Sequence, residues 1–122
     1  MVTLDFSART VLIVEDDIFI ALDLERVLDD AGCSVIGPAS SVERALRKIS
    51  DTKLDAALLD VNLGPELVFP VADRLSAEGV PFIFVTGEPS TVPERHWTRP
   101  VITKPYKAPA VLEALAAVMR PA

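Results

Sequence analysis

The amino-acid sequence predicts an α/β fold in which helices cover both faces of a five-stranded parallel sheet. Short apolar runs typical of buried strands alternate with segments whose apolar residues recur at helical spacing. Parallel neighbouring strands need crossover connections, which helices normally supply. With 122 residues, 50% of them hydrophobic and 25% charged, the chain is expected to form one domain over residues 1–122. Its core is expected at about residues 10–119.

The first strand–helix unit occupies the beginning of this core. Thr10–Val14 is a continuous run of β-branched and apolar residues, which favours a central strand. Helical spacing follows from Ile18 to Ala31. We expect Asp17 to begin this helix and Gly32 to end it.

The second unit begins with a short strand, Cys33–Ile36, which Gly37 and Pro38 are expected to end. Ser40 and Glu43 then match a capping box at the start of a helix. Cys33, the single cysteine, cannot form an internal disulfide and is expected to be a buried structural thiol.

The third unit contains the most informative strand. Ala56–Leu59 is an unbroken apolar run, as expected for a strand buried on both faces, and it ends in the carboxylate of Asp60. Gly64-Pro65 follows soon after and is expected to stop the strand. A helix is predicted from about Glu66 to Glu78, with Pro70 tolerable only in its first turn.

The last two strands are separated by an irregular segment. Val80–Val85 and Val101–Thr103 are predicted strands, and Ala108–Met119 is the last predicted helix. Between them, Glu88–Pro100 contains three prolines and no apolar stripe, so the fourth helix is expected to be short or irregular. His96, the single histidine, is expected to be an exposed residue of this loop.

Right-handed crossovers between these units predict a doubly wound, flavodoxin-like sheet of order 2-1-3-4-5, a (βα)5 arrangement. The carboxyl ends of its strands would share one edge, where open α/β sheets bind their ligands. The polar residues expected at this edge are Glu15, Asp16, Asp17, Asp60, Asn62, Thr86 and Lys104.

Clustered carboxylates repel one another and therefore either raise a pKa or bind a cation. Oxygen ligands without histidine or cysteine suit Mg²⁺. Asp16 and Asp60 are the expected direct ligands, Glu15 would act directly or through water, and the backbone carbonyl near Asn62 could complete the set.

A carboxylate can also attack phosphorus and form an acyl phosphate. Lys104 and Mg²⁺ would neutralise the charge on the phosphoryl oxygens, and the Thr86 hydroxyl could bind one of them. These parts fit phosphoryl transfer to Asp60. Asp17 is assigned only to the helix start, where the helix dipole favours an acid.

Four motifs carry a family resemblance, and they resemble in order and spacing the receiver domain of two-component response regulators, the CheY-like domains. The resemblance extends from about Thr10 to Met119. The motifs are Val11-Leu12-Ile13-Val14-Glu15-Asp16, Leu58-Leu59-Asp60-Val61-Asn62-Leu63, Val85-Thr86-Gly87 and Thr103-Lys104-Pro105-Tyr106.

The resemblance implies a role for each matched residue. Asp60 would be the phosphoacceptor, and Glu15 and Asp16 the acidic pair that binds Mg²⁺. Thr86 would be the switch hydroxyl, and Lys104 would pair with the phosphoryl group. The resemblance also implies that the Lys104–Pro105 bond is cis. A sensor histidine kinase or a phosphotransfer protein would be the partner.

One part of the chain departs from the common family pattern. Val101 stands where an aromatic switch residue is usual, so a different output is expected. Together with residues 81–87 and 93–95, it is similar to a stand-alone subgroup with a Phe-Ala-Thr-Gly-type motif, paired with HWE-type or related histidine kinases. The departures from that subgroup are Pro65, Val85 and Glu88.

Composition excludes some classes of function. The net charge of −6 argues against a nucleic-acid surface, and so short a chain leaves no room for an appended DNA-reading module. The sequence has neither a leader nor an apolar run of membrane-spanning length, so we expect a cytoplasmic protein without membrane contacts.

Several alternatives remain at this point. The chain could be a relay intermediate, a phosphate sink, or a degenerate receiver that binds partners without phosphorylation. A phosphatase with an aspartyl-phosphate intermediate is less favoured, because Asn62 stands where such enzymes have a proton-donating Asp. A flavin-binding function is less favoured still, because no phosphate-binding loop rich in Ser, Thr and Gly follows the first strand. We expect catalysis only of its own phosphorylation and slow dephosphorylation, not a dedicated enzyme.

Overall fold

The computed structural model describes residues 5–119 and contains a five-stranded sheet in which all neighbouring strands are parallel. Its strands are β1 (Thr10–Val14), β2 (Ser34–Ala39), β3 (Ala56–Leu59), β6 (Phe82–Thr86) and β7 (Val101–Thr103). Their spatial order is β2-β1-β3-β6-β7, which confirms the predicted order 2-1-3-4-5.

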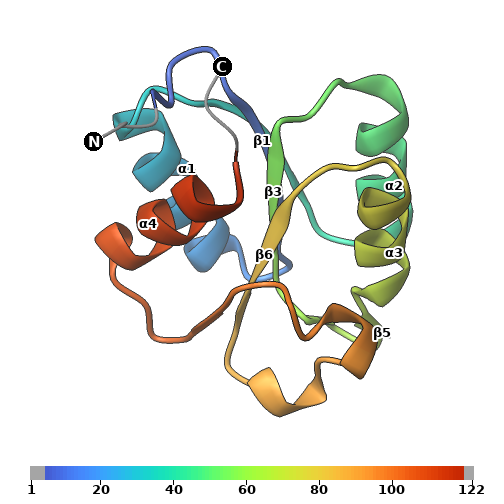
Figure 1. Ribbon diagram of the computed structural model, residues 1–122. Helices are drawn as coiled ribbons and strands as arrows, with labels where there is room; N and C mark the ends of the chain where they lie inside the picture. The colour runs from blue at the N-terminus through green and yellow to red at the C-terminus, as the bar shows by residue number, and fades with distance from the viewer. Residues whose placement is uncertain (1–4, 120–122) are drawn as a thin grey trace.

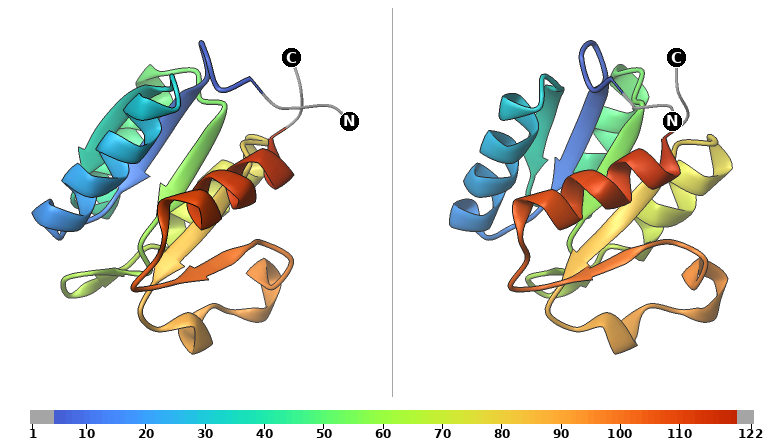
Figure 2. Two further views of the ribbon diagram at one scale, coloured as in Figure 1. Left: turned by 90° about the vertical axis from the view of Figure 1, so that its left-hand side faces the viewer. Right: turned by 60° about the vertical axis from the view of Figure 1, so that its left-hand side comes forward.

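Four α-helices cover the two faces of this sheet. They are α1 (Ile18–Asp30), α2 (Val42–Asp51), α3 (Phe69–Ala77) and α4 (Ala108–Val118). Helices α1 and α4 contact each other on one face, and α2 and α3 contact each other on the opposite face (Figures 1 and 2). The predicted doubly wound α/β architecture is therefore confirmed. No helix within residues 5–119 combines the length and the apolar character needed to cross a bilayer.

The two helical layers enclose two hydrophobic clusters, one on each side of the sheet. Leu12 and Val14 of β1 belong to the cluster beneath α2 and α3, whereas Val11 and Ile13 belong to the cluster beneath α1 and α4. This alternation follows from strand geometry, because successive side chains point to opposite faces. Cys33 is buried in the second cluster, which fits the expected structural thiol.

Helix α1 begins and ends as its sequence predicts. Asp17 is its N-cap, and the Oδ1 atom accepts hydrogen bonds from the backbone N–H groups of Phe19 at 2.9 Å and Ile20 at 3.2 Å. Gly32 follows the C-cap residue Ala31 with a φ of +96°, a conformation that suits glycine.

Strand β2 and the start of α2 correct two predictions. The strand does not end at Ile36 but continues through Gly37 and Pro38, which its place at the sheet edge permits because an edge strand can dispense with ladder hydrogen bonds. The capping box built on Ser40 was also wrong. Ser41 is the N-cap, and its Oγ accepts the N–H of Arg44 at 3.2 Å.

The predicted start of the third helix at Glu66 was wrong, because a small hairpin occupies that stretch. Strand β4 (Asn62–Leu63) pairs antiparallel with β5 (Glu66–Leu67), and Gly64 turns the chain between them with a φ of +65°. Helix α3 begins only at Phe69, with Pro70 in its first turn as expected. Gly64-Pro65, which was predicted only to stop a strand, therefore forms the turn of a hairpin.

The segment between β6 and β7 lacks an α-helix, as its prolines predict. It contains two single-turn 3₁₀ helices, η1 (Pro89–Thr91) and η2 (Glu94–His96), separated by Val92 and Pro93. The expectation of an exposed His96 was wrong, since its side chain is buried against the core. Figure 2 shows this segment passing below the sheet in orange.

Candidate functional site

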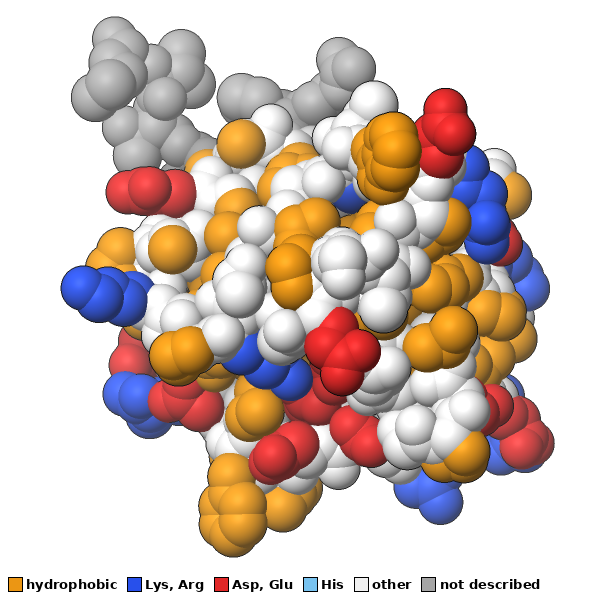
Figure 3. All heavy atoms as spheres, turned by 90° about the horizontal axis from the view of Figure 1, so that it is seen from below, with side chains coloured by type: hydrophobic (Ala, Val, Ile, Leu, Met, Phe, Trp, Pro, Cys, Tyr) orange, Lys and Arg blue, Asp and Glu red, His pale blue; other side chains and the backbone are white. Residues whose placement is uncertain are grey.

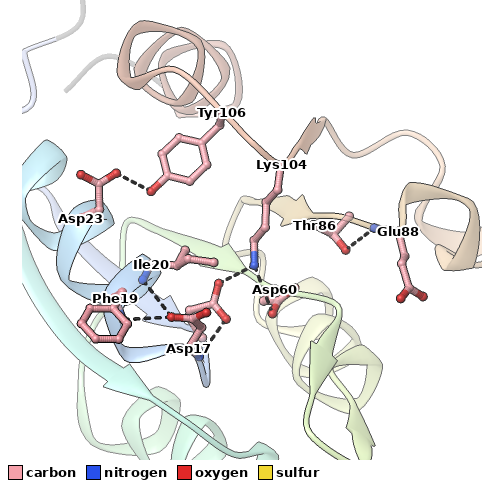
Figure 4. A network of polar contacts seen from close by, with 10 residues as sticks. Asp17, Phe19, Ile20, Asp23, Asp60, Thr86, Glu88, Lys104 and Tyr106 are labelled. Carbon is pink, nitrogen blue, oxygen red and sulfur yellow. Dashed lines mark hydrogen bonds and ion pairs between the residues drawn. The ribbon is translucent and has the colours of Figure 1, made fainter.

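The polar residues predicted for the sheet edge do lie together. Strands β1, β3, β6 and β7 run in parallel, so the residues that follow them meet at one end of the sheet (Figure 4). Glu15 follows β1, Asp60 follows β3, Thr86 ends β6 and Lys104 follows β7. The strand order of the sheet therefore explains why residues far apart in the sequence meet at this site.

Three carboxylates form the acidic part of the site. Glu15, Asp16 and Asp60 each offer an oxygen within 4.8 Å of the others. Glu15 and Asp60 are only 2% and 8% exposed, whereas Asp16 faces solvent. The space-filling view of this end shows red acidic side chains beside a blue basic one (Figure 3).

Lys104 bridges the two buried carboxylates. Its Nζ atom donates to Glu15 Oε1 at 2.7 Å and lies 3.4 Å from Asp60 Oδ2 (Figure 4). The other oxygen of Glu15 accepts the backbone N–H of Asp17 at 3.2 Å. The ammonium group therefore contacts two of the three carboxylates that could hold a cation.

The electrostatics of the cluster fit a divalent cation. Burial, with the neighbouring Asp60 carboxylate in addition, raises the pKa of Glu15 to about 7, although Lys104 opposes this shift. Burial of Lys104 disfavours its charged form, but the hydrogen bond to Glu15 and the charge of Asp60 together raise its pKa. Because burial and the neighbouring Asp60 carboxylate disfavour the ionised form of Glu15, Mg²⁺ bound by these oxygen ligands would favour that form.

Thr86 is fully buried at the end of β6. Its Oγ1 accepts the backbone N–H of Glu88 at 3.0 Å, which leaves the hydroxyl hydrogen available to donate. The backbone N–H of Lys104 donates to the Thr86 carbonyl at 2.8 Å. The residues that carry the hydroxyl and the ammonium are thus joined by a backbone hydrogen bond between neighbouring strand ends.

Asn62 and Pro105 complete the predicted set. Asn62 is half-buried in β4 and pairs with Leu67, and the ligand role of its carbonyl stays a prediction. The Lys104–Pro105 peptide bond is cis.

Sequence reasoning missed one contact near the site. Tyr106 lies two residues after Lys104 in the sequence. Its hydroxyl donates to Asp23 Oδ2 of α1 at 2.7 Å (Figure 4). A groove of about 490 Å³ lies beside this bond, lined by Phe19, Ile20, Asp23, Lys104, Pro105 and Tyr106. The proximity of Tyr106 to Lys104 in sequence was the one available signal, since its partner lies 83 positions away.

Comparison with known proteins gives a consistent result. The family model for the response regulator receiver domain matches residues 11–116. The solution structure of SdrG from Sphingomonas melonis Fr1 is 41% identical and superposes with a TM-score of 0.82, covering 91% of this chain and 96% of that chain.

Two further relatives agree. The BeF₃-activated conformation of SdrG from Pseudomonas melonis Fr1 is 40% identical, with a TM-score of 0.77 and coverage of 93% of this chain and 98% of that chain. The phyllosphere-induced regulator PhyR from Methylorubrum extorquens is 36% identical over 117 residues, which are 88% of this chain. The chain spans only 42% of the length of PhyR.

Proposed function

Because this chain belongs to the response regulator receiver domain family of two-component signalling, we propose that its Asp60 accepts a phosphoryl group from a phosphohistidine. The donor would be a sensor histidine kinase or a phosphotransfer protein. The observation that carries this proposal is the position of Lys104 Nζ, which lies between the buried carboxylates of Glu15 and Asp60. An ammonium there can neutralise the charge that phosphoryl transfer brings in.

The chemical step needs few residues. An Oδ atom of Asp60 attacks phosphorus and forms the O–P bond, while the P–N bond of phosphohistidine breaks and its electron pair returns to the imidazole. Lys104 pairs with the phosphoryl oxygens throughout this transfer. When bound by Glu15, Asp16 and Asp60, Mg²⁺ would supply further neutralisation of charge on those oxygens.

Thr86 then connects the phosphoryl group to the segment after β6. Its hydroxyl can donate to a phosphoryl oxygen, and turning toward that oxygen weakens the hydrogen bond from the Glu88 N–H. Because residue 101 is a valine, half-buried against the hydrophobic cluster, this position has no aromatic ring that could rotate inward. The output is therefore proposed to pass through residues 87–100 to protein–protein contacts.

The identity of the partners follows as a finer proposal. The motif at residues 81–87 supports a kinase of the HWE or a related type, and the likeness to SdrG in its BeF₃-activated form supports a phosphorylated active state. We place this exchange in the cytoplasm. Beyond its own phosphorylation and slow dephosphorylation, we propose no enzymatic activity.

Phosphorylation is tested by incubating the protein with acetyl phosphate, and separately with a phosphorylated histidine kinase, in the presence of Mg²⁺. Intact-mass spectrometry should show one phosphoryl adduct on the wild type and on the control Asp51→Asn, whose carboxylate is exposed at the end of α2. The adduct should be absent from Asp60→Asn. A wild type that stays unmodified with both donors would favour a degenerate receiver instead.

A further inference from the structure

His96 is a buried titratable side chain that the proposed phosphoryl transfer does not use. It is 3% exposed and packs among three phenylalanine rings. Its ring stacks on Phe69 with 6.3 Å between centroids, and it meets Phe82 at 5.7 Å and Phe84 at 6.0 Å edge-on. Because Phe69 comes from α3 and the other two rings come from β6, His96 fixes η2 against both elements.

One hydrogen bond orients this imidazole. His96 Nε2 lies 2.8 Å from Asp73 Oδ1 on α3. Hydrogen bonds from Arg95 lower the pKa of Asp73 against the effect of burial, and the bond from His96 lowers it further, so this carboxylate is ionised and can only accept. Nε2 therefore carries the hydrogen. Within the described part of the chain, the buried Nδ1 atom has no hydrogen-bond partner, so the rest of the ring packs as an apolar group.

Two arginines strengthen the same attachment. Arg95 makes two hydrogen bonds to Asp73, at 2.8 Å and 3.0 Å. Arg99 donates to Ser76 Oγ on α3 at 3.1 Å, and its guanidinium lies 4.4 Å above the centre of the Phe82 ring. Residues 95, 96 and 99 thus all bind the segment to α3 and β6.

The first half of the segment is held very differently. Residues 87–91 are exposed, and their polar contacts stay within one turn. The Glu88 N–H donates to Thr86 Oγ1 at 3.0 Å, and the Thr91 hydroxyl donates to the Glu88 carbonyl at 2.7 Å. Val92 is buried, and its carbonyl accepts the Trp97 indole N–H at 2.9 Å, which links the two halves.

We propose that His96 is a positioning residue that anchors residues 93–99 to α3 and thereby confines the response to phosphorylation to residues 86–92. This inference rests on the proposed function, in which Thr86 turns toward a phosphoryl group on Asp60. When Thr86 gives up the Glu88 N–H, the exposed half loses its nearest polar contact. The anchored half keeps its contacts with Asp73, Ser76 and the phenylalanine rings, so the displacement ends near Val92.

The test compares backbone amide NMR spectra before and after adding BeF₃⁻ with Mg²⁺, a phosphoryl analogue that needs no donor. In the wild type, shift changes should be several times larger at residues 86–92 than at residues 94–99. The His96 ring should keep its hydrogen on Nε2 in both states, as read from its ¹⁵N shifts. In His96→Ala and Asp73→Ala, large changes should spread through residues 94–99 and into α3, whereas Thr98→Ala, an exposed control, should match the wild type.

Each outcome decides between the claims. Large changes throughout residues 94–99 of the wild type, or a wild-type pattern in Asp73→Ala, would overturn the anchoring role. Asp73 is half-exposed, with a side-chain exposure of 48%, so Asp73→Ala remains informative even where His96→Ala fails to fold. If BeF₃⁻ leaves the surroundings of Asp60 unchanged in the wild type, the proposed function itself fails, and the anchoring inference fails with it.

Discussion

Lys104 neutralises two carboxylates that would otherwise repel each other. It contacts Glu15 at 2.7 Å and Asp60 at 3.4 Å, and its side chain is only 18% exposed. A cation in this position substitutes in part for a metal ion, and it could neutralise the negative charge that a phosphoryl group brings in. The energetics of the site therefore depend on how its three ionisable groups share charge.

Replacing Lys104 with methionine should destabilise the fold by about 1–2 kcal/mol at pH 8, because two buried carboxylates would lose their counter-charge. The loss should be smaller at pH 5, where Glu15 holds a proton. Urea unfolding at both pH values measures this, with Lys48→Met as the exposed control. Equal, small losses for both variants at both pH values would contradict the bridging role.

The stability of the fold should also depend on pH through Glu15. Its pKa is 4.5 in the unfolded chain and about 7 in the fold, so the folded state binds its proton more tightly. Stability should be greatest below pH 4.5 as far as this group is concerned, fall between pH 4.5 and 7, and stay lower above pH 7. The total drop in the free energy of unfolding should be about 3 kcal/mol without metal.

The pH dependence is checked by urea unfolding of the wild type and of Glu15→Gln in EDTA. The glutamine variant keeps a polar side chain of similar shape but cannot ionise, so its curve should lack this drop. A glutamine variant that loses as much stability as the wild type over this pH range would assign the effect to other groups.

The elements of the fold follow from sequence wherever the controlling interactions are local. Strand runs such as Ala56–Leu59 are recognisable because both faces of the sheet are buried, and Asp17 is recognisable as a cap because it bonds residues two and three positions on. The candidate carboxylates could be predicted for the same reason, since each directly follows a strand. Their hydrogen bonds and pKa shifts needed the structure.

Long-range contacts account for two of the predictions that were wrong. His96 is buried because Asp73 and the phenylalanine rings surround it, and no local pattern reveals a partner 23 positions away. The N-cap of α2 moved from Ser40 to Ser41 in a stretch where the Val42 N–H also meets Glu66 from the hairpin at 3.3 Å. Tertiary contacts such as these override local propensity.

Gly37 lies where strand β2 approaches β1 closely. It has a φ of +98°, and an added Cβ would lie 2.8 Å from the Ile13 carbonyl oxygen. Gly37→Ala should therefore cost about 2–4 kcal/mol from backbone strain and crowding together. Gly79→Ala is the matched control, because its φ is +69° but its surroundings are open; it should cost about 1 kcal/mol. Equal costs in denaturant unfolding would show that the close approach of β2 to β1 is unimportant.

The whole molecule separates stability from response. The clusters on the two faces of the sheet are buried, whereas Glu15, Asp16, Asp60 and Lys104 gather at one end of it (Figures 3 and 4). The segment after β6 begins at this end and is attached to α3 farther along. We therefore propose that a charge added at Asp60 changes the exposed surface at residues 87–91 without disturbing the core.

Magnesium should stabilise the whole fold, because the three carboxylates lie close enough to bind one ion only when the chain is folded. At a concentration about 100 times the dissociation constant, the gain would be about 2.7 kcal/mol. The melting temperature of the wild type should rise with MgCl₂, and the rise should be much reduced in Asp16→Asn, whose exposed side chain should not affect folding. Asp51→Asn is the control. The same rise in all three proteins would exclude a specific site at this cluster.

The proposed role of Asp60 as the phosphoacceptor can be checked by locating the phosphoryl group after transfer. After phosphotransfer from a histidine kinase, borohydride reduction converts an acyl phosphate into a homoserine residue that peptide mass spectrometry can place. We predict a single modified position, Asp60, with no modification at Glu15 or Asp16. Modification at either of those residues, or at none of the three in a protein that the kinase engages, would contradict this account.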